Sequence, residues 1–171
     1  MNSDKLDLEK LAFGGGCHWC TEAVFQSLIG VRQVEQGYVS SEAPYDTFSE
    51  AVIVHYDPEV ITVEVLLEIH LRTHNSTKDH SMRDKYRSAV YTFDSIQHKT
   101  ILQLLERLQT LFTDVLITTA LPFKEFKTSR AEITNYYYSN PEKAFCKQYI
   151  DPKLQLLLRD YSSYLLKGKT T

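Results

Sequence analysis

The spacing of hydrophobic residues changes along the chain and predicts strands and helices in alternation. An apolar run at residues 11–13 ends at three glycines, residues 14–16, and Val24 then follows Cys17 at the spacing of one helix face. This pattern predicts a short buried strand, a glycine turn and a helix that ends at Gly30.

Further strands and helices follow in the same way. Runs rich in β-branched and aromatic residues predict strands at residues 31–39, 50–56, 88–93 and 115–119. Helical spacing predicts one helix after Thr62, which can cap it, and another helix opened by a capping box at residues 94–97. The resulting order of elements predicts an α+β fold, in which a mixed sheet carries helices on one face.

The last third of the chain has a weaker pattern. It is compatible with a helix at residues 131–138, a turn at Asn140-Pro141 and a final helix at residues 154–166. The 171 residues are 43% hydrophobic, which fits one globular domain spanning residues 1–171.

Charge and targeting features narrow the functional classes. The net charge is −3, so no basic field is present to attract nucleic acid or an anionic membrane surface. Residues 1–10 lack the apolar core of a secretory signal, and no run approaches the roughly 18 apolar residues that cross a bilayer. We therefore expect a cytoplasmic protein.

Cys17 is the first candidate for chemistry. It lies where the glycine turn meets the predicted helix, so unpaired backbone N–H groups and the helix dipole are expected to favour its thiolate. The glycines leave the backbone free to adopt unusual angles and allow a substrate to approach. The alternative is a small buried cysteine packed behind a turn.

Cys17-His18-Trp19-Cys20 is also a Cys-x-x-Cys motif, which leaves two other interpretations open. One is a thioredoxin-like dithiol oxidoreductase that uses Cys17 and Cys20. The other is a zinc-binding interaction domain, in which His70 and His74 join the two cysteines from one helix face. A single motif of this kind is weak support for zinc, and His70 lies on an apolar stripe.

The run from Ala12 to Phe25, AFGGGCHWCTEAVF, resembles the signature of the peptide methionine sulfoxide reductase A family. The resemblance continues through Gly37-Tyr38 and through residues 50–58, 86–91 and 140–154, and covers most of the chain. It implies a two-layer α/β sandwich around a mixed, ferredoxin-like sheet. It also implies thiol-dependent reduction of methionine S-sulfoxide, free or in proteins, through a cysteine sulfenic acid and a disulfide.

The resemblance assigns roles to individual residues. Cys17 would attack the sulfoxide sulfur, and Glu50, able to hold a proton when buried, would serve as the acid for the departing oxygen. Tyr86 would hold that oxygen together with a second tyrosine, for which Tyr45 is the first choice and Tyr38 the fallback. The alternative for these tyrosines is amphipathic packing in a chain that has eleven of them.

Trp19 would receive the methyl group of the substrate. Beside it the sequence departs from the family, because His18 replaces the usual phenylalanine. We expect His18 to be a tolerated substitution in the pocket wall, and the alternative is that it turns toward the cysteine and supports its thiolate.

Two further departures affect the site. The chain between Tyr45 and Glu50 is shorter than in common members of the family, which weakens the assignment of Tyr45. The family's Asn-Asp-x-Gly-x-Gln run before the second tyrosine is absent, and Asp79 or Asp84 are candidates for the supporting role of its aspartate.

Regeneration needs a second thiol, and the resemblance implies Cys146, carried by a mobile C-terminal segment of about residues 135–171. Cys20 is expected to be a structural thiol, because two helical residues this close seldom reach disulfide geometry. Thioredoxin or another dithiol would supply electrons. We expect no metal and no organic cofactor, and a monomer.

Overall fold

A six-stranded sheet forms the centre of the molecule. The computed structural model describes residues 7–130 and 134–166 of the 171-residue chain. The strand order is β5-β4-β1-β3-β2-β6, and β4 with β5 is the one parallel pair among the described strands, which confirms the predicted mixed sheet. The strands are β1 (Glu9–Gly14), β2 (Val31–Ser40), β3 (Ser49–Tyr56), β4 (Ala89–Thr92), β5 (Thr119–Pro122) and β6 (Glu125–Thr128).

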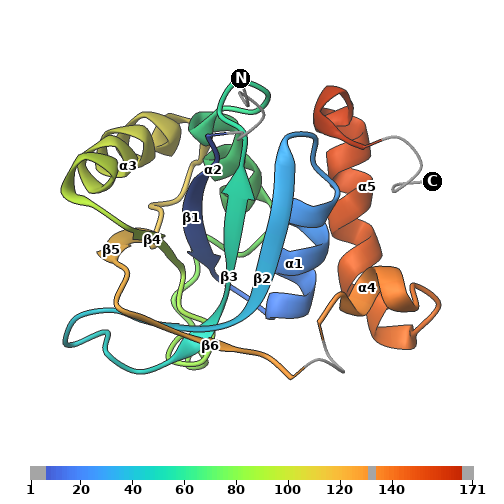
Figure 1. Ribbon diagram of the computed structural model, residues 1–171, viewed down its shortest axis with the longest axis horizontal. Helices are drawn as coiled ribbons and strands as arrows, with labels where there is room; N and C mark the ends of the chain where they lie inside the picture. Colours follow the sequence, from blue (N-terminus) through green and yellow to red (C-terminus); the bar gives the residue numbers. More distant parts are fainter. Residues whose placement is uncertain (1–6, 131–133, 167–171) are drawn as a thin grey trace, which may run out of the picture.

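The helices pack against this sheet, and Figure 1 shows α5 running beside α1. The α-helices are α1 (His18–Gln26), α2 (Val63–Arg72), α3 (Ser95–Leu108), α4 (Tyr136–Ser139) and α5 (Asp151–Asp160). Short turns of other helix types are η1 (Gln109–Leu111), η3 (Cys146–Ile150) and η4 (Ser162–Tyr164). No helix in the described part of the chain is long and apolar enough to cross a membrane.

The two faces of the sheet bury different sets of residues. Leu11 and Phe13 of β1 belong to the main core, which also contains the buried side chains of α1, α2, α3 and α5. Ala12, between them, points to a smaller cluster made of strand and loop residues. The helices therefore cover one face, as the sequence pattern predicts.

Both predicted helix starts are confirmed by their caps. The Thr62 hydroxyl accepts a hydrogen bond from the Val65 amide at 3.3 Å. The Asp94 carboxylate accepts from the Gln97 amide at 2.7 Å, and the Gln97 side chain accepts in turn from the Phe93 amide at 2.8 Å.

The strand predicted at residues 115–119 is wrong in its position, because β5 begins only at Thr119. The side chain of Gln109 accepts from the Leu116 amide at 2.8 Å and donates to the Asp114 carbonyl at 2.9 Å. These side-chain bonds occupy backbone groups that a strand would use. The edge strand β6 was not predicted, because its residues are mostly exposed and carry little apolar pattern.

The last helix also differs from its prediction. It begins at Asp151, with Pro152 in its first turn, and ends at Asp160 rather than at residue 166. Of the helix predicted at 131–138, residues 136–138 lie in α4, and residues 131–133 lie outside the described chain. Cys146, Ile150 and the buried leucines of α5 belong to the main core, so mobility of the C-terminal segment stays a prediction.

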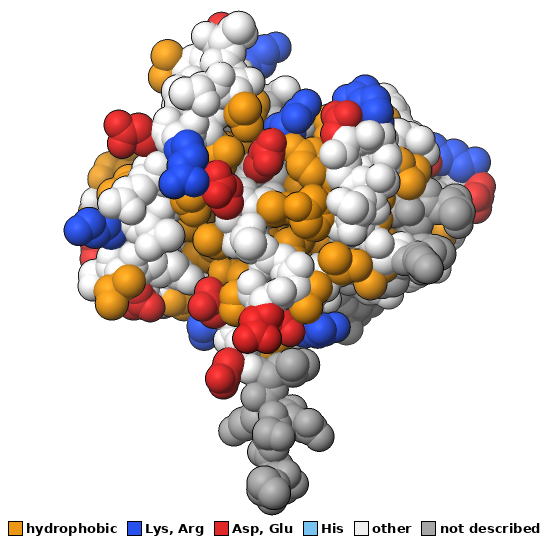
Figure 2. Space-filling view, turned by 90° about the horizontal axis from the view of Figure 1, so that it is seen from above, with side chains coloured by type: hydrophobic (Ala, Val, Ile, Leu, Met, Phe, Trp, Pro, Cys, Tyr) orange, Lys and Arg blue, Asp and Glu red, His pale blue; other side chains and the backbone are white. Residues whose placement is uncertain are grey.

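A hollow of about 530 Å³ lies at the start of β1 and the end of β3, lined among others by Glu9, Tyr56 and Ile96. Figure 2 shows this end of the molecule, where hydrophobic side chains alternate with acidic and basic ones. The strand β1 runs from here to Gly14, so the hollow and the cysteine turn lie at opposite ends of the strand.

The glycine turn has one tightly constrained position and one open position. Gly15 has a φ of +157°, and a Cβ added there would lie 2.5 Å from the His74 ring. A Cβ added at Gly16 would meet no atom within 4 Å.

We therefore predict that Gly15→Ala destabilises the protein by about 1–3 kcal/mol, the usual cost of forcing atoms into a packed site, whereas Gly16→Ala is close to neutral. Urea unfolding of both variants checks this. Equal stabilities of the two variants would contradict the packing of the turn.

Candidate active site

Cys17 lies at the N-cap of α1, directly after the turn that follows β1. Its φ of −58° and ψ of 128° are not helical, and its carbonyl accepts from the amides of Cys20 at 3.0 Å and Thr21 at 3.2 Å. The side chain is half-buried and caps no backbone group. The predicted sequence of strand, glycine turn and helix is confirmed, with Cys17 at its end.

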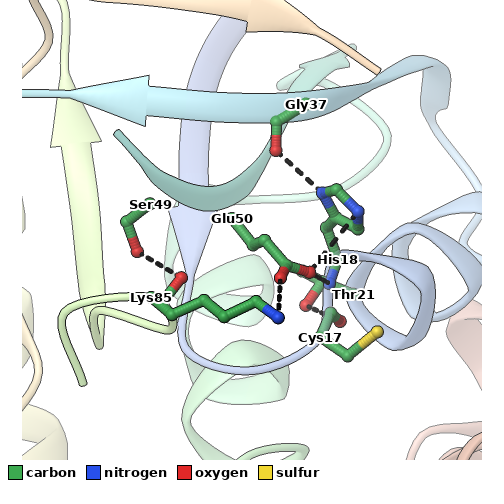
Figure 3. A network of polar contacts seen from close by, with 7 residues as sticks. All are labelled: Cys17, His18, Thr21, Gly37, Ser49, Glu50 and Lys85. Carbon is green, nitrogen blue, oxygen red and sulfur yellow. Dashed lines mark hydrogen bonds and ion pairs between the residues drawn. The ribbon is translucent and has the colours of Figure 1, made fainter. Parts of the chain in front are cut away.

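Glu50 comes from the start of β3 and lies against the beginning of α1. It is 6% exposed, and its Oε1 accepts from the backbone N–H of His18 at 3.2 Å. Its Oε2 lies 3.7 Å from Lys85 Nζ. The carboxylate therefore satisfies an open amide at the helix start, one residue after Cys17 (Figure 3).

The His18 ring lies against the Glu50 carboxylate. Its Nδ1 lies 2.8 Å from the Gly37 carbonyl, which can only accept, so Nδ1 carries a hydrogen. Its Nε2 faces Glu50 Oε1 at 3.4 Å. This contact is favourable only when a proton lies on Nε2 or on the carboxyl group. His18 is thus turned toward Glu50 and Gly37, not toward the Cys17 thiol, and its role as a tolerated wall substitution stays a prediction.

Tyr38 and Tyr86 each contact a residue of this group. The Tyr38 ring packs edge-on against His18 at 5.2 Å between centroids, and its backbone pairs with Glu50 across β2 and β3. The half-buried Tyr86 lies with its ring 5.1 Å from Lys85 Nζ, the same ammonium that contacts Glu50.

The structure does not bring Tyr45 to this group. Its ring is 42% exposed and lies under the Arg87 guanidinium at 5.6 Å, in a hollow that Asp79 and Asp84 also line. The turn before Tyr45 is the reason, because the Tyr45 carbonyl accepts from the Ser41 amide and the Tyr45 amide donates to the Glu42 carbonyl. The fallback, Tyr38, lies against His18 instead, and its role stays a prediction.

Trp19 packs against the C-terminal segment. Its ring stacks on Tyr136 with 4.1 Å between centroids and 7° between planes, and Phe145 meets it edge-on at 5.2 Å. The buried Glu22 carboxylate holds this arrangement by accepting from the amides of Asn135 at 2.9 Å and Tyr136 at 3.0 Å. One face of Trp19 is therefore covered by an aromatic residue that the sequence did not single out.

A small cavity of about 40 Å³ lies behind the thiols, lined among others by Cys17, Cys20, His70, His74 and Lys153. His70 Nε2 donates to the Gly14 carbonyl at 2.8 Å, and His74 bonds to the His70 carbonyl and to Ser88. Burial lowers the pKa of His74 to about 3 and lowers the pKa of His70 well below its usual value. Both rings are therefore neutral supports of the turn.

The zinc hypothesis finds no support in this cavity. Three of the four imidazole nitrogens of His70 and His74 already have partners. Among the described residues, no group of three or more histidine, cysteine, aspartate or glutamate side chains is arranged to hold a metal ion.

The thiols of Cys17 and Cys20 form a coupled pair. A hydrogen bond with Cys20 and then burial raise the pKa of Cys17, against the expectation that the helix start lowers it. The same hydrogen bond lowers the pKa of Cys20. Only the amide of Trp19 acts in the expected direction on Cys17, and the neighbouring thiol outweighs it. The coupling between the two thiols thus raises the pKa of Cys17 and lowers that of Cys20.

Cys146 is fully buried at the start of η3, the turn after Phe145. Its thiol donates to the Asn140 carbonyl at 3.7 Å. Burial raises the pKa of this thiol. The structure thus places Cys146 next to a residue that contacts Trp19, with its sulfur bonded elsewhere.

Comparison with known proteins decides the family. The model of the family described as "Peptide methionine sulfoxide reductase" matches residues 9–164. The chain belongs to the peptide methionine sulfoxide reductase family. A relative from Psychrobacter sp. (strain PRwf-1), peptide methionine sulfoxide reductase MsrA, is 35% identical, with 94% of this chain and all of the relative covered. Membership makes this chain an oxidoreductase that reduces methionine sulfoxide with thiols, in place of a thioredoxin-like or zinc-binding protein.

Solved structures agree in fold. The crystal structure of Mxr1 from Saccharomyces cerevisiae in an unusual oxidised form is 26% identical, with a TM-score of 0.67 over 81% of this chain and 84% of Mxr1. Mxr1 has also been solved in complex with Trx2, with 23% identity and a TM-score of 0.60 over 80% of this chain and 89% of that one.

Three residues that contact this candidate site were not predicted from the sequence: Lys85, Lys153 and Tyr136. They lie far along the chain from the first helix or in segments without a clear pattern. Only Lys153 could have been found, because it belongs to a run that resembles the family.

The lowered pKa values of His70 and His74 predict that the free energy of unfolding depends on pH. The native rings stay neutral at pH values where an unfolded histidine is protonated, so stability is complete above about pH 6.5 and falls as pH drops toward about 3. Each histidine contributes a slope of at most about 1.4 kcal/mol per pH unit. Urea unfolding should show a smaller slope in His74→Asn than in His80→Asn, a variant at an exposed histidine. Equal slopes would contradict the neutral-support role.

The contact between His18 and Glu50 predicts a loss of activity in His18→Phe. We expect kcat for methionine sulfoxide to fall about tenfold, less than the roughly 10²–10⁴-fold contribution of a general acid itself, because Glu50 loses a ring nitrogen that can exchange a proton with it. The matched control is His55→Phe, which removes the His55–Glu35 pair elsewhere on the sheet. An unchanged kcat in His18→Phe would show that His18 is only a wall.

Proposed function

We propose that Cys17 attacks the sulfur of methionine S-sulfoxide, free or within oxidised proteins. The observation that supports this most directly is the position of Cys17 at the start of α1, one residue from the contact of His18 with the buried Glu50. Attack forms a Cys17 sulfenic acid and releases methionine, so the oxygen passes from the substrate to the enzyme sulfur.

Glu50 and His18 would supply the proton that the sulfoxide oxygen needs as charge builds on it. The Tyr38 ring contacts His18, and the Tyr86 ring contacts Lys85, which in turn contacts Glu50. We propose that these two tyrosines hold the oxygen. Lys85 keeps positive charge beside Glu50 while the proton leaves.

Trp19 would receive the substrate methyl group, as the family resemblance implies. Because Tyr136 covers one face of the indole, the methyl group would use the other face or displace Tyr136. An apolar contact here favours the S-methyl end of the substrate over a polar one.

Cys146 would complete the cycle by forming a disulfide with Cys17, with loss of water from the sulfenic acid. Its burial and its bond to Asn140 mean that η3 must rearrange for this step. Thioredoxin or another dithiol would then reduce the disulfide. The complex of the similar protein Mxr1 with Trx2 supports this choice of reductant.

The remaining proposals concern the location, the oligomeric state, the cofactors and the fold type of the protein. We propose a cytoplasmic monomer that uses no metal and no organic cofactor. The net charge of −3 fits that setting. A ferredoxin-like description of the core is supported by the order β4-β1-β3-β2, which the unit β1-α1-β2-β3-α2-β4 supplies.

The test is a stereochemical assay with dithiothreitol as reductant. The parent should consume the S epimer of methionine sulfoxide and leave the R epimer, and Cys17→Ser should consume neither, because a hydroxyl cannot take its place as nucleophile. Circular dichroism confirms that the variant folds. Retained S-epimer reduction in Cys17→Ser would refute the proposal.

A further inference from the structure

We propose that Cys20 is a second redox-active thiol, which captures the Cys17 sulfenic acid before Cys146 does. This rests on the proposed function, in which Cys17 becomes the sulfenic acid. Cys20 would then be a catalytic residue rather than a structural thiol.

The geometry at the start of α1 removes the objection to a bridge within one helical turn. In the interior of a helix, Cβ atoms three residues apart lie about 5–6 Å from each other, whereas a disulfide needs about 3.5–4.5 Å. Cys17, however, is the N-cap, and its ψ of 128° takes it out of the helical conformation. Its side chain can therefore turn toward Cys20 without unwinding the helix.

The Cys17 and Cys20 thiols already line one small cavity in the reduced protein. Each thiol also shifts the pKa of the other, raising that of Cys17 and lowering that of Cys20. Figure 3 shows the Cys17 sulfur pointing away from the Glu50 carboxylate. The Cys17 thiol is thus directed away from Glu50, on the side of the cavity that Cys20 also lines.

The surroundings favour a reactive Cys20. The cavity behind the thiols is also lined by Lys153, whose ammonium donates one hydrogen bond to the Thr73 carbonyl and has two more hydrogens to offer. This half-buried ammonium lowers the pKa of Cys20. Cys146, in contrast, is fully buried, and its thiol donates to the Asn140 carbonyl.

The chemistry balances without an added oxidant. The Cys20 sulfur attacks the Cys17 sulfenic sulfur, the S–S bond forms, the S–O bond breaks, and the hydroxide leaves as water with the Cys20 proton. Cys146 then attacks Cys17, and Cys20 leaves as the thiolate. This order is favourable because a thiol of lower pKa is the better leaving group.

The experiment is one turnover without reductant. The parent, Cys146→Ser, Cys20→Ser and Cys20→Ala are mixed with one equivalent of methionine S-sulfoxide, quenched in acid, alkylated and mapped by mass spectrometry. Methionine release is measured in the same samples and reports the attack by Cys17 separately. The second Cys20 variant guards against misfolding caused by a buried serine.

We expect a Cys17–Cys20 disulfide in Cys146→Ser, with no sulfenic acid that dimedone can label. In both Cys20 variants, the Cys17–Cys146 bridge should form at least tenfold more slowly than in the parent. Methionine release with a persistent sulfenic acid and no Cys17–Cys20 bridge in Cys146→Ser would overturn this proposal alone. Absence of methionine release from the parent would overturn the proposed function as well.

Discussion

The hydrogen bond from His70 Nε2 to the Gly14 carbonyl fixes the point on which the rest of the site depends. It holds the end of β1 against α2, while Gly15 leaves room for His74 and allows the backbone to turn into α1. A side chain at Gly15 would meet His74, so the turn and the histidine support require each other. Because the turn is held on both sides, Cys17 has a defined place at the start of the helix.

At Cys17 the backbone separates the side chains that could donate a proton from those that lie near the second thiol. On one side, the buried Glu50 carboxylate accepts from the His18 amide and faces the His18 ring. On the other side, Cys20 and the half-buried Lys153 line the cavity that Cys17 also lines. Proton donation and thiol exchange therefore use different neighbours, and Cys17 lies between them.

Local patterns in the sequence predicted much of this arrangement. Glycine chemistry, β-branched runs and capping residues are encoded within a few positions, and the turn, the mixed sheet and both helix caps followed from them. What local patterns could not show were contacts made across the sheet. The turn of His18 toward Gly37 and the position of Tyr45 under Arg87 depend on strand pairing and on the course of a short loop. The stacking of Tyr136 on Trp19 depends on a buried carboxylate more than one hundred residues away, at Glu22. The direction of the Cys17 pKa was mispredicted for a local reason, since the thiol of Cys20, one helical turn away, together with burial outweighs the helix start.

The most direct measurement of the central claim uses the double variant Cys20→Ser/Cys146→Ser, in which Cys17 is the remaining cysteine. Reaction with one equivalent of methionine S-sulfoxide in the presence of dimedone, followed by peptide mapping, should give one adduct per protein, on Cys17, matched by one methionine released. Release of methionine with Cys17 still in its thiol form would contradict the account, because the oxygen would then have passed to some other group.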